Sequence, residues 1–144
     1  MNTKLVQDLM TKNPITVTGN TTLPEAYWVM LKKNIHQLPV LEYEKVVGIV
    51  TLEDLRRMDP ISVAGLDLIR VSDMLAKLPV RQVMTPNPKI ISPQAPLVEA
   101  AKLLLEYDIR ALPVVENERL VGIISVQDIL RTIVENEEGE SENA

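Results

Sequence analysis

The sequence predicts an α/β (α+β) fold made of two tandem copies of one β-α-β-β-α unit. Its 144 residues are 46% hydrophobic and 24% charged, a globular composition for one ordinary domain or two very small ones. A shift of 74 residues aligns positions 8–58 with 82–132 without a gap, and 19 of the 51 aligned pairs are identical. Within each copy, helical and strand-like apolar periods follow in the same order.

The elements of the first copy are predicted in order from local signals. An extended segment at 15–17 follows an Asn-Pro pair, and a helix at 23–34 has apolar residues at helical spacing. Thr22 and Glu25 have the spacing of a capping box, and Pro24 lies in the first turn, where a missing N–H does no harm. Strands at 38–41 and 46–51 and a helix at 52–58 complete the copy. The second copy repeats this order at 89–92, 97–107, 112–115, 120–125 and 126–136.

The predicted strands are almost continuously apolar, which is typical of strands covered on both faces. A unit of about fifty residues is too small to bury both faces of its sheet. We therefore expect the two copies to pack sheet to sheet about a pseudo-twofold axis. The expected domains are repeat 1 at 6–58 and repeat 2 at 80–135. The linker at 59–79 is expected to contain short helical turns, from the spacing of Val71, Met74, Leu75 and Leu78.

The net charge of −5 comes from five glutamates after residue 134, so residues 136–144 are predicted to be a disordered acidic tail. Residues 1–134 carry no net charge, and only 3% of the chain is aromatic. Both observations argue against nucleic acid as a partner. The chain has no cysteine, one histidine and no Gly-rich phosphate loop, so neither an enzyme nor a metal site is expected. The sequence contains no apolar stretch long enough for a membrane span, so none is expected. The expected location is the cytoplasm.

The clearest candidate site is a hydroxyl residue followed three positions later by aspartate, where a strand becomes a helix. Thr51 and Asp54 form this pair in the first copy, and Ser125 and Asp128 form it in the second. Spacing alone favours a capping box, in which the two side chains satisfy backbone N–H groups.

The ordered set Met-Thr, Asn-Pro, Glu-Ala, Leu-Pro-Val, Val-Gly-Ile and Thr/Ser-x-x-Asp occurs twice and resembles the CBS domain. Two tandem copies resemble a CBS pair, or Bateman module. The resemblance implies a regulatory module that binds AMP, ADP or ATP (with or without Mg) or S-adenosylmethionine in clefts between the repeats. It implies that Asp54 and Asp128 accept hydrogen bonds from the ribose hydroxyls, and that Thr51 and Ser125 contact ribose or phosphate.

The resemblance also implies ligand contacts at two other places in each copy. The turn before the Leu-Pro-Val strand is expected to face phosphates, although a cation there also suits a helix C-terminus. The segment after Asn-Pro is expected to meet the adenine, with core packing as the alternative. These residues are His36, Gln37, Arg110 and Ala111 at the turns, and Ile15, Thr16, Lys89 and Ile90 after Asn-Pro. Gln37 and Ala111 stand where the family often has a second arginine.

The function expected from the sequence is a stand-alone regulatory module that passes the occupancy of an adenosine ligand to an unidentified partner or to its own oligomeric state. A homodimer is expected, with Trp28 as an interface residue. The alternatives are a scaffold with empty sites and an S-adenosylmethionine sensor.

Overall fold

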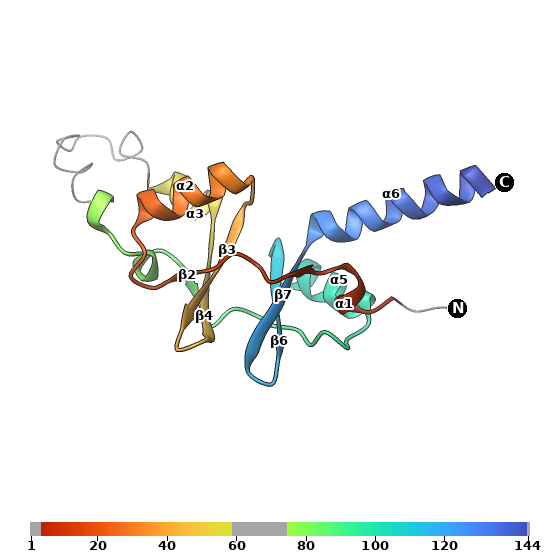
Figure 1. Ribbon diagram of the computed structural model, residues 1–144, viewed down its shortest axis with the longest axis horizontal. Coiled ribbons are helices and arrows are strands. Elements are labelled where there is room, and N and C mark those ends of the chain that lie inside the picture. The colour runs from red at the N-terminus through yellow and green to blue at the C-terminus, as the bar shows by residue number, and fades with distance from the viewer. Residues whose placement is uncertain (1–3, 59–74, 144) are drawn as a thin grey trace. The chain divides into compact units, whose positions relative to one another are not determined.

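The computed structural model describes residues 4–58 and 75–143, with side chains as far as residue 138. The chain divides into two compact units. The first-repeat unit is Ile15–Pro88, and the second-repeat unit combines Met1–Pro14 with Lys89–Ala144. Each contains one sheet and its helices, which confirms the α/β class and the doubled element order (Figure 1). The packing of the two sheets against each other stays a prediction.

The first-repeat unit has a four-stranded sheet in the order β2-β3-β4-β5. Its strands are β2 (Val17–Thr18), β3 (Gln37–Glu42), β4 (Lys45–Thr51) and β5 (Thr85–Pro86). Helices α2 (Leu23–Lys33) and α3 (Leu52–Arg57) lie side by side over this sheet, and a short 3₁₀ helix, η2, spans Val80–Gln82 (Figure 1). The capping box predicted at the start of α2 is confirmed: the Thr22 N–H donates to Glu25 Oε2 at 3.0 Å, and the Glu25 N–H donates to Thr22 Oγ1 at 3.4 Å.

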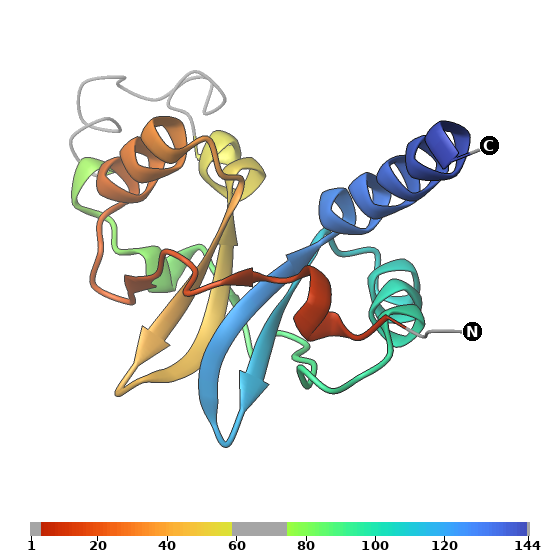
Figure 2. The ribbon, with the colours of Figure 1, turned by 45° about the vertical axis from the view of Figure 1, so that its right-hand side comes forward.

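The second-repeat unit has a three-stranded sheet in the order β1-β7-β6. Its elements are α1 (Val6–Leu9), β1 (Thr11–Lys12), α5 (Leu97–Glu106), β6 (Ala111–Glu116), β7 (Arg119–Ser125) and α6 (Val126–Asn143). The N-terminal segment with α1 and β1 lies along β7, and α6 extends well past the end of the strands (Figure 2). The segment predicted as extended at 89–92 is held by a parallel bridge between Ile91 and Val114.

Each unit buries an aliphatic core that includes a segment from the other sequence repeat. Val80 is fully buried in the core of the first-repeat unit, and its repeat equivalent Val6 is fully buried in the second-repeat unit. Backbone bonds hold these segments: the Val80 N–H donates to the Thr21 carbonyl at 2.7 Å, and the Val6 N–H to the Ala95 carbonyl at 2.9 Å. The start of each sequence repeat is thus exchanged between the two units.

The acidic tail and part of the predicted linker are helical. The acidic tail is not disordered as predicted, because α6 continues to Asn143. Glutamate is a good helix former, and the packed turns at the start of α6 remove the cost of nucleation. Within the predicted linker, residues 75–77 are helical and η2 follows, while residues 59–74 lie outside the described residues.

A methionine covers a strand glycine in each unit. A Cβ at Gly48 would lie 2.3 Å from the sulfur of Met84, and one at Gly122 would lie 2.5 Å from the sulfur of Met10. These methionines immediately precede β5 and β1, so the missing side chain of glycine lets each exchanged segment approach the sheet.

We expect Gly48→Ala to lower the free energy of unfolding by about 1–3 kcal/mol, because Met84 must move. Adding Met84→Ala should recover part of that loss in chemical denaturation. The same rescue by Met10→Ala should be weaker for Gly122→Ala, since the Thr11 carbonyl oxygen also lies 2.9 Å from the added Cβ and belongs to the backbone. If the losses of unfolding free energy were simply additive in Gly48→Ala/Met84→Ala and in Gly122→Ala/Met10→Ala, the methionine would not be what excludes a side chain at the glycine.

Candidate functional site

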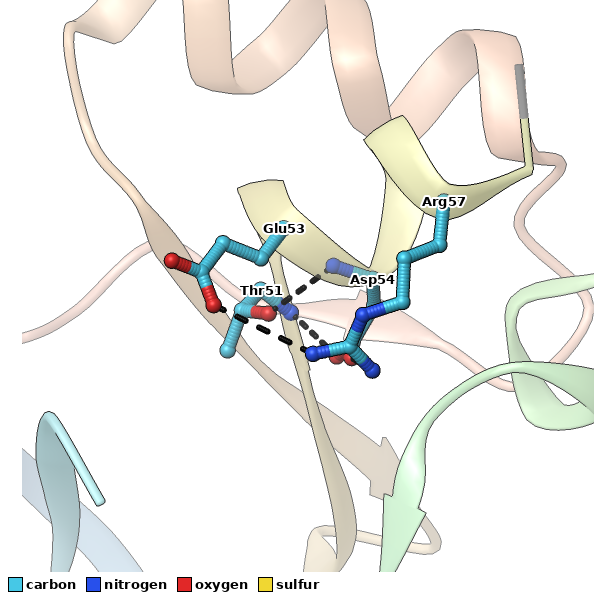
Figure 3. Close-up of polar contacts among 4 residues, drawn as sticks. All are labelled: Thr51, Glu53, Asp54 and Arg57. Atoms are coloured by element: carbon cyan, nitrogen blue, oxygen red, sulfur yellow. Dashed lines mark hydrogen bonds and ion pairs between the residues drawn. The ribbon is translucent and has the colours of Figure 1, made fainter. Parts of the chain in front are cut away.

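The predicted hydroxyl–aspartate pair forms a reciprocal capping box where β4 becomes α3. The Thr51 N–H donates to Asp54 Oδ2 at 2.9 Å, and the Asp54 N–H donates to Thr51 Oγ1 at 3.1 Å. Figure 3 shows both side chains at this turn, with Arg57 beside the carboxylate. The capping role is therefore confirmed, and it uses only part of a carboxylate that offers about four lone pairs.

The second repeat reproduces this turn between β7 and α6. The Ser125 N–H donates to Asp128 Oδ2 at 2.9 Å, and the Asp128 N–H donates to Ser125 Oγ at 3.2 Å. Only 13% of each aspartate side chain is exposed. Two independent turns therefore hold a carboxylate in the same way, mostly buried and fixed by hydrogen bonds to the backbone.

The sequence analysis missed a cation beside each carboxylate. An Arg57 nitrogen lies 3.6 Å from Asp54 Oδ1, and an Arg131 nitrogen lies 3.5 Å from Asp128 Oδ1. Both arginines are mostly exposed, so each pair stabilises the fold only slightly. The signal was present in the sequence, because the two arginines are equivalent positions of the repeat, three residues after the aspartate on the same helix face.

In the first-repeat unit, the predicted site residues meet at one end of the sheet. Gln37 pairs with Thr51 across β3 and β4, and the carbonyl of His36 accepts the Leu52 N–H at 2.9 Å. Strand β2 runs parallel to β3 with Val17 opposite Val40, so the preceding Ile15 and Thr16 lie toward the same end. The register of the sheet therefore places four features close together: the turn before β3, the Thr51 hydroxyl, the Asp54 carboxylate and the extended segment before β2.

The second-repeat unit gathers the matching residues in the same way. Ala111 pairs with Ser125, and the Arg110 carbonyl accepts the Val126 N–H at 3.0 Å. The parallel bridge at Ile91 brings Lys89 and Ile90 toward this end. Ile90 here and Ile15 in the first-repeat unit are exposed aliphatic side chains. They are not equivalent positions, because Ile15 corresponds to Lys89 and Ile90 to Thr16. The Lys89 amine lies 4.5 Å from the centre of the Tyr107 ring, a contact that the sequence analysis did not foresee.

An open pocket of about 300 Å³ adjoins the first carboxylate. Its lining combines polar and apolar side chains: Asp54, Arg57, Met58, Leu78, Gln82 and Val83. Two of the six lining residues, Gln82 and Val83, come from the segment exchanged into the unit, so the pocket depends on the tertiary structure. A pocket with an oriented carboxylate, a guanidinium and apolar walls can bind a small polar molecule with an apolar part.

No cluster of three or more His, Asp or Glu suited to a metal ion occurs in the described residues. Among these same residues, none of the helices combines the length and apolarity needed to cross a bilayer.

A family model described as "CBS domain" matches the chain twice, over residues 6–60 and 80–135. The chain belongs to the CBS domain family. The two matches confirm the resemblance that the repeated motifs indicated, and the hydroxyl–aspartate turns lie near the end of each CBS repeat.

Relatives of this CBS pair include both large enzymes and short proteins. It is 32% identical over 131 residues to the L-aspartate semialdehyde sulfurtransferase of Methanocaldococcus jannaschii, covering 88% of this chain but only 23% of that protein. It is 30% identical over 132 residues to the CBS domain-containing protein YhcV of Bacillus subtilis, covering 92% of this chain and 87% of that protein.

Two solved structures with ligands are similar to this CBS pair. The CBS domain pair of protein MJ0100, in complex with 5′-methylthioadenosine and S-adenosyl-L-methionine, has a TM-score of 0.78 and 29% identity, covering 94% of this chain and 99% of that one. CBSX2 in complex with AMP, a protein of Arabidopsis thaliana, has a TM-score of 0.75 and 30% identity, covering 92% and 98%. Pairs of this family thus include proteins that bind adenosine derivatives.

Proposed function

We propose that this CBS pair is a regulatory module that binds an adenosine-containing ligand of the AMP, ADP or ATP class without turning it over. The observation that carries the proposal is the aspartate held in the same way in both repeats. Each carboxylate is fixed by its own turn and keeps lone pairs beyond those used by the cap. Two vicinal ribose hydroxyls are suitable donors for such a carboxylate.

The other predicted contacts support a nucleotide at the same end of each sheet. Ile15 and Ile90 offer exposed aliphatic surface to a base, which would gain affinity by burial of apolar area. His36 and Arg110 are exposed and lie at the turn that is bonded to the following helix start. Their roles toward phosphate, and those of Gln37, Ala111, Thr16 and Lys89 toward the ligand, are part of this proposal.

The test is the loss of AMP affinity when the carboxylate is removed. Asp54→Ala and Asp128→Ala should each weaken AMP binding at the altered repeat by about 5- to 150-fold, the equivalent of about 1–3 kcal/mol for hydroxyls left unpaired. Titration calorimetry on the purified chain measures this effect directly.

Glu25→Ala is the matched control, because Glu25 has the same place in the capping box of α2 and lies outside the site. All three variants should lose a similar capping contribution, roughly 0.5–2 kcal/mol of unfolding free energy. Only the aspartate variants should lose AMP. If they melt lower but bind AMP as the wild type does, the carboxylates act as caps alone and the protein is a scaffold with empty sites.

An S-adenosylmethionine sensor is the second candidate, supported by the ligands of the MJ0100 pair. The adenosine part is common to both ligand classes, so the aspartate variants test both. Thermal shifts with AMP, ATP, S-adenosylmethionine and 5′-methylthioadenosine separate them, since the ligand with the largest excess over its dissociation constant stabilises most. A larger shift with S-adenosylmethionine than with any nucleotide at equal concentration would favour this second candidate.

We further propose a homodimer in which α2 contributes to the interface. Trp28 is 59% exposed and Leu31 is 56% exposed on this helix, and the Lys32 amine lies 4.5 Å from the indole centre. Aromatic residues exposed in this way are enriched at interfaces. Trp28→Glu should shift sedimentation toward the monomer, whereas Val98→Glu on α5, which is also 59% exposed, is the control. An unchanged dimer in Trp28→Glu would exclude α2 from the interface.

A further inference from the structure

The pocket beside Asp54 is lined by one polar side chain to which the nucleotide proposal gives no role, the carboxamide of Gln82. Gln82 ends η2, in the segment that the second sequence repeat supplies to the first-repeat unit. Its side chain is exposed and has no hydrogen-bond partner within residues 4–58 and 75–138. The amide therefore offers two N–H donors and a carbonyl acceptor to a molecule that enters the pocket.

Comparison of the repeats explains why this side chain lacks a partner. The equivalent residue in the second-repeat unit is Asp8, whose carboxylate accepts a hydrogen bond from the Leu5 N–H at 2.8 Å and so caps α1. The residue equivalent to Leu5 is Pro79, which directly precedes η2. Proline has no N–H, so a side chain at position 82 has no such capping bond to make. Gln82 is thus available to a ligand, whereas Asp8 is engaged.

The apolar walls of the pocket also differ between the repeats. Met58 and Leu78 line it in the first-repeat unit, and the equivalent residues of the second-repeat unit are Thr132 and Lys4. Both of these polar side chains have hydrogen-bond partners within their own unit. The combination of a fixed carboxylate, an amide without a partner and apolar walls therefore distinguishes the surroundings of Asp54.

A ribose hydroxyl needs two kinds of partner in such a pocket. Its hydrogen is donated to an acceptor such as the Asp54 carboxylate, and its oxygen accepts a hydrogen bond from a donor. Arg57 is a donor on the same lining, but its guanidinium lies 3.6 Å from Asp54 Oδ1, and Arg131 forms the same pair in the second-repeat unit. The neutral donor on this lining is Gln82.

We infer that Gln82 is a ligand-binding residue of the first-repeat site, where its amide N–H donates to the oxygen of a ribose hydroxyl that itself donates to Asp54. The inference rests on the proposed binding of an adenosine ligand at Asp54, and adds a residue that recognises the sugar. The first-repeat site is thus completed by a side chain from the other sequence repeat. The second-repeat site lacks this contact, because Asp8 caps α1.

The test is titration calorimetry of AMP into the full chain carrying Asp128→Ala, in which the second-repeat site has lost its carboxylate. Adding Gln82→Met keeps the length of the side chain and removes the amide, so AMP should bind about three- to tenfold more weakly. Gln82→Asp should weaken AMP at least as much, since a carboxylate has no N–H to donate. Gln127→Met is the matched control, because this exposed glutamine lies beside Asp128 in the altered site, and AMP affinity should not change.

Two analogues, 2′-deoxy-AMP and 3′-deoxy-AMP, identify the hydroxyl that Gln82 contacts. The analogue that lacks this hydroxyl should bind equally well with and without Gln82→Met, because the amide then has no partner to lose. AMP and the other analogue should keep the three- to tenfold difference. Position 82 is exposed, and equal thermal unfolding of the two chains shows that Gln82→Met leaves the fold unchanged.

The inference is overturned if Gln82→Met binds AMP as tightly as its parent, or if both deoxy analogues lose as much affinity as AMP when the amide is removed. Asp54→Ala in the same background tests the proposed function separately. A loss of AMP with Asp54→Ala beside an unchanged Gln82→Met would refute the contact and keep the nucleotide site. Unchanged AMP binding in both variants would refute the two together.

Discussion

A fragment of residues 15–88 should fold cooperatively, whereas a fragment of residues 6–58, which is the first repeat as the sequence divides it, should not. The longer fragment keeps the whole sheet β2-β3-β4-β5 of the first-repeat unit and all of its core. The shorter one loses β5, the fully buried Val80, and the backbone bond from the Val80 N–H to the Thr21 carbonyl. A domain of this size is only marginally stable, so the loss of these contacts should prevent the shorter fragment from folding.

Thermal unfolding followed by far-ultraviolet circular dichroism distinguishes the two fragments. Residues 15–79 serve as the control, because that fragment ends just before the exchanged segment and should resemble 6–58. A cooperative transition in 6–58 at the same temperature as in 15–88 would show that the exchanged segment adds little to the first-repeat unit.

Val80→Asp should unfold the first-repeat unit in the full-length chain, and Val6→Asp should unfold the second-repeat unit. Each change places a carboxylate at a fully buried aliphatic position without a partner. The expected loss of unfolding free energy is about 3–5 kcal/mol, the cost of an uncompensated buried charge. This is a large share of the stability of a small domain.

Hydrogen exchange shows which unit has opened. In Val80→Asp, the amides of β3 and β4 should lose protection while those of β6 and β7 keep it, and Val6→Asp should give the opposite pattern. Gln82→Asp is the control, because this exposed position in η2 is aspartate in the equivalent place of the other repeat, Asp8. Val80 belongs to the same sequence repeat as β6 and β7. If Val80→Asp removed protection from β6 and β7 instead of β3 and β4, the division of the chain into these two units would be wrong.

Much of the fold and of the candidate site follows from short-range signals. Apolar periodicity predicted α2, α5 and the β3–β4 and β6–β7 hairpins, with ends differing from the structure by a few residues at most. The two capping boxes at Thr51 and Ser125 were also predictable, since their partners lie three residues away. The identity of the repeats then implied that both sites share one arrangement.

The sequence by itself determined the repeat, from its self-similarity at a shift of 74 residues. It also determined the α/β class and the residues at each strand-to-helix turn, because these depend on neighbours within about one helical turn. Only the tertiary structure decided where α1, β1 and β5 belong. Strands of two residues are too short to show a period, and their partners lie on the other repeat's sheet. The pocket beside Asp54 likewise requires segments distant in sequence to meet. Such contacts are set by the packing of whole elements, which no local pattern encodes.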